Sequence, residues 1–210
     1  MPFVDYIALE GQSIIGIWKN EESYEDLLLQ LQPREVLLEQ LNNLRLLKRK
    51  KEYMITRLLV RELLGEDKMI VKNPAGKPDF EDSTLKLSIS HADKYSGVFI
   101  SESKECGLDI EQIMPRISRL SKKFVSEYES LYVTIGKPVL HYTIMWCVKE
   151  AIYKWYAKRG LDFKQNMIIH PFKAEEEGQL YFELVKSGEK KTNIAYFKVI
   201  DNHVVAWLAM

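Results

Sequence analysis

The order of helical and strand-like segments is similar in the two halves of this chain of 210 residues. Apolar residues recur at helical spacing between 23 and 64, and strand candidates follow. The second half again places helical segments, 122–133 and 141–158, before a series of strand candidates. This coarse duplication predicts an α+β fold of two similar lobes, 1–106 and 107–210, that meet at a cleft.

Residues that favour turns divide the chain further. Pro33 is expected to begin a second helix in the first helical region, and Gly65 is expected to end that region. Gly160 is expected to end the last helix. Pro and Gly are dense in 73–78, which predicts a loop. Strands are expected at 3–9, 13–18, 86–90, 95–101, 106–110, 167–169, 180–185, 194–200 and 204–208.

The composition is that of a soluble globular protein with ample material for a core, since 46% of the residues are hydrophobic. Lys and Arg number 30, and so do Asp and Glu, so no global field favours nucleic acid or an anionic membrane. The chain has no signal-peptide pattern and no apolar run long enough to span a bilayer. Its two cysteines form no CxxC motif. We therefore expect a cytoplasmic protein.

A pair of carboxylates lies in the strand candidate at the predicted junction of the lobes. In Gly107-Leu108-Asp109-Ile110-Glu111, period-two alternation puts Asp109 and Glu111 on the same side of the sheet. The simplest explanation of such a pair is the solvated face of an amphipathic strand. Oxygen-rich clusters of this kind also suit Mg²⁺, which bridges to phosphate oxygens. A third carboxylate, Glu150, can reach them from a helix.

The helical segment around Glu150 carries an aromatic, an acidic and a basic residue on one face. Trp146, Glu150 and Lys154 are spaced i, i+4, i+8, and Lys149 lies one step away from that face. Each has an ordinary alternative, because Glu150 and Lys154 can form an exposed ion pair and Trp146 can be a core residue. Their clustering opposite an acidic pair favours a site for phosphate chemistry.

Other candidates lie in the first half. Ser90-His91 ends a strand candidate, where α+β folds tend to expose ligand-binding groups, although a lone histidine is more often structural. Lys77 and Pro78, in Gly76-Lys77-Pro78, offer a cation and a close backbone approach, but can equally form a plain surface turn. Arg57 can approach the core edge, where a partly buried guanidinium needs an anionic partner such as phosphate.

These motifs together resemble the Sfp-type 4′-phosphopantetheinyl transferase family. The resemblance rests on Gly76-Lys77-Pro78, Ser90-His91, Gly107-Leu108-Asp109-Ile110-Glu111 and Trp146-x-x-Lys149-Glu150-x-x-x-Lys154, in that order. It implies a monomer of two α+β lobes related by pseudo-twofold symmetry, with coenzyme A bound in the cleft between them. It also implies Mg²⁺-dependent transfer of phosphopantetheine to a serine of an apo acyl or peptidyl carrier protein, with release of adenosine 3′,5′-bisphosphate.

The resemblance assigns roles to individual residues. Asp109, Glu111 and Glu150 would hold Mg²⁺ against the coenzyme A pyrophosphate. Lys154 would stabilise or protonate the leaving phosphate, Lys149 would support the pyrophosphate, and Glu150 would help to deprotonate the serine hydroxyl. Contacts to the 3′-phosphate and adenine end of coenzyme A are assigned to Arg57, Lys77, Pro78, Ser90 and His91.

Two rival functions use the same residues. One is a non-catalytic module that binds coenzyme A or a carrier protein, and the other is a phosphohydrolase built on the same acidic cluster. The presence of all three carboxylates and of Lys154 argues against the first. The sequence does not choose among carriers, because partner choice depends on surface complementarity.

Overall fold

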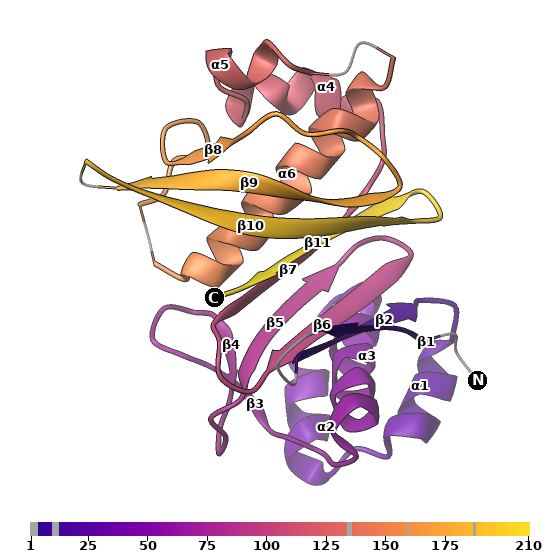
Figure 1. Ribbon diagram of the computed structural model, residues 1–210. Coiled ribbons are helices and arrows are strands. Elements are labelled where there is room, and N and C mark those ends of the chain that lie inside the picture. The colour runs from indigo at the N-terminus through magenta and orange to yellow at the C-terminus, as the bar shows by residue number, and fades with distance from the viewer. Residues whose placement is uncertain (1–3, 10–12, 134–135, 159, 187) are drawn as a thin grey trace.

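The structure is a computed structural model that describes residues 4–9, 13–133, 136–158, 160–186 and 188–210. It contains two larger antiparallel sheets, each covered by helices, and a short two-stranded ribbon. Figure 1 shows the first sheet with its helices in the lower half of the molecule and the second in the upper half. The mixed helix and sheet class is therefore confirmed, whereas the pseudo-twofold relation and the division at residue 106 stay predictions.

The first sheet has the strand order β1-β2-β6-β5. Its strands are β1 Val4–Leu9, β2 Ser13–Lys19, β5 Lys86–His91 and β6 Tyr95–Ser101. The helices beside it are α1 Tyr24–Leu31, α2 Glu35–Asn42 and α3 Leu47–Leu64. Leu27, Leu41 and Leu59, from the predicted helical pattern, are fully buried in the core on this sheet. Gly65 ends α3 with a φ of 73°, as the sequence predicts.

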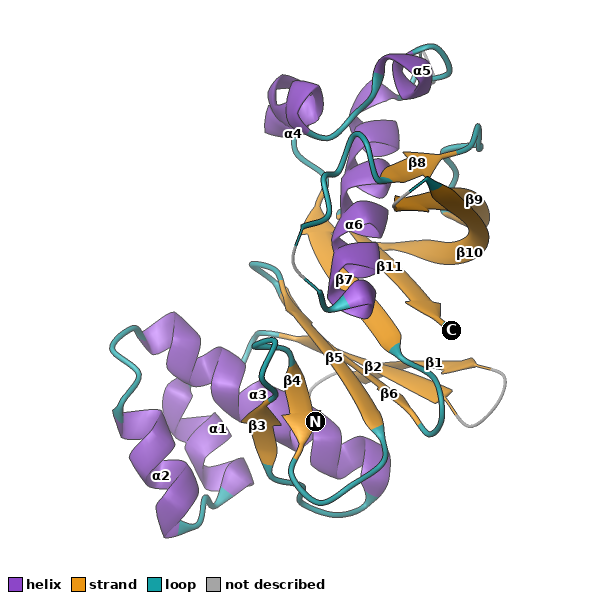
Figure 2. Ribbon diagram, turned by 90° about the vertical axis from the view of Figure 1, so that its left-hand side faces the viewer, coloured by secondary structure: helices purple, strands orange, loops and turns teal. Residues whose placement is uncertain are grey.

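The second sheet has the strand order β7-β11-β10-β9-β8. The strands are β7 Cys106–Gln112, β8 Met167–Ile169, β9 Glu177–Lys186, β10 Glu189–Ile200 and β11 His203–Ala209. Helix α6, Pro138–Tyr156, packs on β7 and β11 and is seen against this sheet in both ribbon views (Figure 2). Val148, Ile152 and Phe182 are among the fully buried residues of the core between them.

The two sheets meet where the edge strand β5 lies beside the edge strand β7. A separate cluster that includes Ile17, Phe99, Leu108 and Trp207 fills the space between the sheets. Two buried serines of β5 bridge to the backbone of β7. The Leu108 amide donates to Ser88 Oγ at 2.9 Å, and the Ile110 amide donates to Ser90 Oγ at 3.1 Å. The side chains of one strand thus satisfy backbone donors of the other.

Three predicted elements differ from the structure. The helix expected at 122–133 is wrong, because this region forms α4 Arg116–Leu120, the 3₁₀ turn η1 Ser121–Lys123 and α5 Glu127–Ser130. The last helix ends with Ala157 in the left-handed region, before Gly160. The loop at 73–78 is the turn of a ribbon formed by β3 Ile70–Lys72 and β4 Pro78–Phe80. Among the described helices, none is both long and apolar enough to cross a membrane.

Candidate functional site

Strand β7 brings Gly107, Asp109 and Glu111 to the face that α6 covers. A Cβ at Gly107 would overlap the Ala151 carbonyl oxygen of α6. Asp109 Oδ1 lies 2.7 Å from Lys154 Nζ, and Glu111 Oε1 accepts a 2.9 Å bond from the Trp146 indole N–H. The two carboxylates therefore lie on one side of the strand, as alternation predicts. Because Gly107 has no side chain, α6 can approach β7 closely.

The α6 face predicted from i, i+4, i+8 spacing is the face that meets these carboxylates. Trp146 contacts Glu111 and Lys154 contacts Asp109 through the bonds just described. Between them, Glu150 is close enough to Asp109, Glu111 and Lys154 for their charges to act on its carboxyl. The helical period therefore places one α6 side chain against each part of the acidic pair.

Negative charge exceeds positive charge in this cluster. Burial, together with the charges of Asp109 and Glu111 and against that of Lys154, raises the pKa of Glu150 to about 7. Burial and Asp109 also raise the pKa of Glu111. Asp109 Oδ2 is buried and has no hydrogen-bond partner among the described residues. Three carboxylates share one lysine, so a further cation would relieve both the repulsion and the orphaned oxygen.

The three carboxylates do not form a finished metal site. In the described part of the chain, no three His, Cys, Asp or Glu side chains gather in a metal-holding arrangement. Asp109 Oδ1 contacts Lys154 and the Ser90 hydroxyl instead. The donors are nevertheless the oxygen ligands that Mg²⁺ prefers, and the unpaired Asp109 Oδ2 is available as one of them.

Ser90 is a positioning residue for Asp109 in the free protein. Its buried hydroxyl donates to Asp109 Oδ1 at 2.9 Å and accepts from Lys154 Nζ at 2.9 Å. It also accepts the Ile110 amide. One donor and two acceptor sites are thereby all used. The predicted contact of Ser90 with the 3′-phosphate and adenine end would require at least one of these bonds to be exchanged.

We expect Ser90→Ala to reduce stability and to disturb the Asp109–Lys154 pair. It leaves the Ile110 amide unpaired, which costs about 1–3 kcal/mol. Ser88→Ala is the matched variant, because Ser88 is equally buried and caps the Leu108 amide without touching Asp109. Chemical denaturation should show similar losses for both variants, and phosphopantetheine transfer should fall further in Ser90→Ala. Equal transfer in the two variants would contradict the positioning role.

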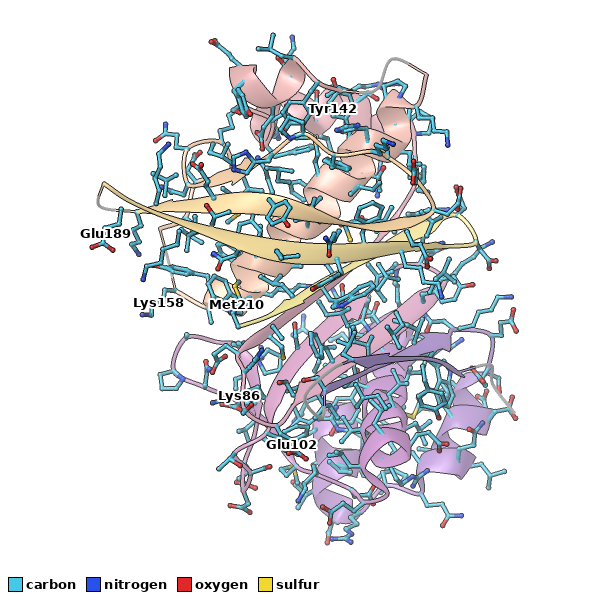
Figure 3. All side chains as sticks on the ribbon, viewed as in Figure 1. Lys86, Glu102, Tyr142, Lys158, Glu189 and Met210 are labelled. Atoms are coloured by element: carbon cyan, nitrogen blue, oxygen red, sulfur yellow. The ribbon has the colours of Figure 1, made fainter. Side chains whose placement is uncertain are left out.

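One cavity, of about 230 Å³, lies beside this cluster, between the β3–β4 ribbon, β5 and the end of α6. Lys77, Pro78 and Lys154, which the resemblance assigned to coenzyme A, all line it. Lys77 Nζ is held by Glu105 Oε2 at 2.9 Å and by the Cys106 carbonyl at 3.2 Å. The remaining lining residues are Ala75, Gly76, Ser88, Ile89, Tyr153, Ala157 and Lys158, and Lys158 lies at the level where the lobes meet (Figure 3).

A second cavity, of about 380 Å³, lies against Glu111 and contains His91 together with Lys48 and Arg116. Burial, and to a smaller extent the charges of Lys154, Arg49 and Lys48, lower the pKa of His91 to about 4. His91 is therefore neutral near pH 7. The cavity also contains Asp93 and Glu111, so its two cations are matched by two carboxylates, and Lys48 lies 3.6 Å from Asp93.

Two predicted residues lie elsewhere. The Arg57 guanidinium lies 3.3 Å from the centre of the Tyr53 ring, its Nη1 donates to the Tyr53 carbonyl, and it lines neither cavity. Lys149 lines neither cavity, so its predicted support of the pyrophosphate would require its present contacts to be exchanged. Lys149 is fully buried, and its ammonium contacts Glu129 and the carbonyl oxygens of Phe124 and Phe163. Its three donors are already used.

Sequence reasoning missed several lining residues. Lys158 and Tyr153 line the first cavity, and Arg116 and Met114 line the second. Lys158 follows Ala157, which ends α6 in the left-handed region, so the helical period does not place it. Nothing in the local pattern marks Arg116, because its segment follows β7 in a short helix that the periodicity did not predict.

Comparison with known families supports the resemblance at a coarser level. Residues 105–207 match the model of the 4′-phosphopantetheinyl transferase superfamily, ACPS. The match covers β7, α6 and most of the second sheet, and therefore Asp109, Glu111, Glu150 and Lys154. No curated protein matches the chain. This segment is therefore similar to the superfamily, and the Sfp-type subfamily stays a prediction.

Proposed function

We propose that this protein transfers the 4′-phosphopantetheine arm of coenzyme A to a serine of an apo acyl or peptidyl carrier protein. The reaction would require Mg²⁺ and would release adenosine 3′,5′-bisphosphate. The observation that carries the proposal is the meeting of Asp109, Glu111, Glu150 and Lys154 beside a cavity lined by Lys77 and Pro78. Phosphopantetheine transfer is also the activity named by the family that residues 105–207 match.

The two cavities offer complementary places for coenzyme A. In the first, Pro78 and Ile89 provide apolar surface for a planar base, and Lys77 and Lys154 provide cations. In the second, Lys48 and Arg116 are the cations that a phosphate could contact, and Asp93 and Glu111 line the same cavity. Lys154 lines the first cavity while its Nζ contacts Asp109, so it can reach a phosphate from its present position.

The chemistry follows from charge placement. Mg²⁺ held by Asp109, Glu111 and Glu150 would neutralise charge on the pyrophosphate oxygens. The carrier serine oxygen attacks the phosphorus that bears the pantetheine arm, and the bond from that phosphorus to adenosine 3′,5′-bisphosphate breaks. The serine proton passes to Glu150, which lies beside Asp109, Glu111 and Lys154. Lys154 stabilises the leaving phosphate.

A basic segment follows β7 directly and offers a docking surface for an acidic carrier. It consists of the exposed residues Arg116, Arg119, Lys122 and Lys123, and no acidic residue lies between 112 and 126. We expect Arg119→Glu/Lys122→Glu to lower kcat/KM for an acidic carrier about 10-fold at low salt, because steering is lost. The loss should shrink as salt increases.

The matched control for this prediction is Lys190→Glu/Lys191→Glu, in exposed residues of the β9–β10 hairpin, next to Glu189 in Figure 3. Steady-state kinetics with varied carrier concentration should be unchanged for this control. An equal loss in both variants, or a loss that does not depend on salt, would exclude the basic segment as the docking surface.

The proposed reaction can be tested by intact-mass analysis of an apo carrier protein after incubation with the protein, coenzyme A and Mg²⁺. We expect a mass gain of one phosphopantetheine that is absent with EDTA. A parallel incubation without carrier tests for hydrolysis of coenzyme A, which the rival phosphohydrolase requires. Binding of coenzyme A without a mass gain on several unrelated carriers would support the non-catalytic module instead.

A further inference from the structure

The ammonium of Lys149 joins three separate segments of the second lobe. It donates to the Phe124 carbonyl at 2.7 Å, to the Phe163 carbonyl at 2.8 Å and to Glu129, whose Oε1 lies 2.7 Å away. The Lys149 and Glu129 side chains are completely buried. Glu129 in turn accepts the Ser126 and Ile169 amides. The pair therefore links α6 to the end of η1, to α5, to β8 and to the loop that follows α6.

The two carbonyls that Lys149 binds belong to the residues whose rings flank Trp146. The Phe124 ring centre lies 5.1 Å from that of Trp146, and the Phe163 ring centre lies 5.4 Å from it. The indole N–H of Trp146 donates to Glu111 at 2.9 Å. A continuous chain of contacts therefore runs from Lys149 through two aromatic residues and Trp146 to a carboxylate of the site.

We infer that Lys149 is a positioning residue, which holds Phe124 and Phe163 around Trp146 and thereby fixes the direction of Glu111. The effect of this positioning on phosphopantetheine transfer rests on the proposed function, but the arrangement of rings around Trp146 does not. Three fixed acceptors on separate segments require a side chain with three donors, which lysine supplies and an apolar residue of similar size does not.

Stability alone is a poor reason for this buried pair. Buried ion pairs lose hydration that their attraction only partly returns, and apolar replacements of both partners are often as stable. A purely structural role and a positioning role therefore predict different results when the pair is replaced together. The first predicts a change in stability only, and the second predicts that Trp146 and Glu111 lose their orientation.

The test variant is Lys149→Met/Glu129→Gln. Lys149→Met alone would leave a buried charge on Glu129, which costs about 3–5 kcal/mol and can prevent folding. The double variant removes that charge together with both carbonyl contacts. Ile144→Val is the control, because it weakens the same helix by about 0.5–1.5 kcal/mol through a buried residue that is not part of the arrangement.

The first measurement is the fluorescence of Trp146, obtained by subtracting the spectrum of each protein's Trp146→Phe counterpart. In the double variant, we expect emission at longer wavelength and stronger quenching by acrylamide, whereas Ile144→Val should resemble the wild type. Unchanged Trp146 emission in the double variant would overturn the inference. This measurement needs no substrate, so it stands even if the protein transfers no phosphopantetheine.

The second measurement is a double-mutant cycle on transfer. Losses from disturbed supporting contacts are typically about 10–100-fold, and we expect kcat/KM of the double variant to fall in that range. In a Trp146→Phe background, where the donor to Glu111 is already missing, the same substitutions should cost much less. Equal losses in the two backgrounds would show that Lys149 does not act through Trp146 and would overturn the inference.

Discussion

Gly107→Ala is expected to prevent stable folding of the second lobe or to reduce stability by more than about 3 kcal/mol. A Cβ at this position would overlap the Ala151 carbonyl and would lie 2.9 Å from both the Trp155 Cβ and its amide nitrogen. These atoms belong to the interior of α6, so no flexible side chain can move aside. The helix would have to withdraw from β7, and Lys154 and Trp146 would withdraw with it.

Gly136→Ala is the matched control for this prediction. A Cβ at Gly136 meets nothing within 4 Å, so this substitution should leave the free energy of unfolding nearly unchanged. Chemical denaturation followed by circular dichroism measures both variants. A stability of Gly107→Ala within about 0.5 kcal/mol of the wild type would contradict the close approach of α6 to β7.

The parts of the site that could be predicted are those governed by a single local period. Alternation placed Asp109 and Glu111 together, and the helical period placed Trp146, Glu150 and Lys154 together. Each set lies within one regular element. Their convergence required one further assumption, that the helix packs on the strand, and Gly107 is the residue that permits it.

Lys149 could not be predicted in the same way. Its neighbours on α6 are part of the site, and the family resemblance assigned Lys149 to the pyrophosphate. The structure rotates it toward Phe124, Phe163 and Glu129, which come from segments that no local period connects to α6. One residue on a helix corresponds to a rotation of about 100°, so adjacent residues can belong to different environments.

The helices around 116–130 were also beyond the sequence pattern. They contain only short runs, and their boundaries depend on caps. Ser126 begins α5 through a capping box with Glu129, and the buried Glu129 carboxylate also pairs with Lys149. A cap and a tertiary contact thus meet at this short helix, whereas apolar spacing alone favoured one longer helix.

Glu150→Gln is expected to change activity and stability in opposite directions. Transfer should fall about 10²–10⁴-fold, because the amide can neither take the serine proton nor supply a carboxylate to the metal. Stability in EDTA should rise at pH 8, because the substitution removes a buried charge from a cluster that already holds Asp109 and Glu111. A carboxylate that lowers stability in the free protein and raises activity is an example of the trade-off between stability and activity that is common at active sites.

The raised pKa of Glu150 determines how the free energy of unfolding changes with pH. The carboxyl of Glu150 has a pKa of about 7 in the folded protein, against the model-compound value of 4.5 in the unfolded chain. Between these values the folded state holds a proton that the unfolded state has released, so stability falls as the pH rises through this window. Below pH 4.5 the carboxyl is protonated in both states, and Glu150 no longer lowers the stability of the folded protein.

Thermal and chemical unfolding of the wild type and Glu150→Gln should therefore agree near pH 4.5 and differ by about 1–3 kcal/mol at pH 8, after allowance for solvent screening. Addition of Mg²⁺ at pH 8 should stabilise the wild type more than the variant, because an ion bound only to the folded state raises its stability. If the stability of the wild type and that of Glu150→Gln had the same pH profile in EDTA, the raised pKa of Glu150 would be contradicted. A variant that is stabilised by Mg²⁺ as much as the wild type would remove Glu150 from the proposed metal ligands.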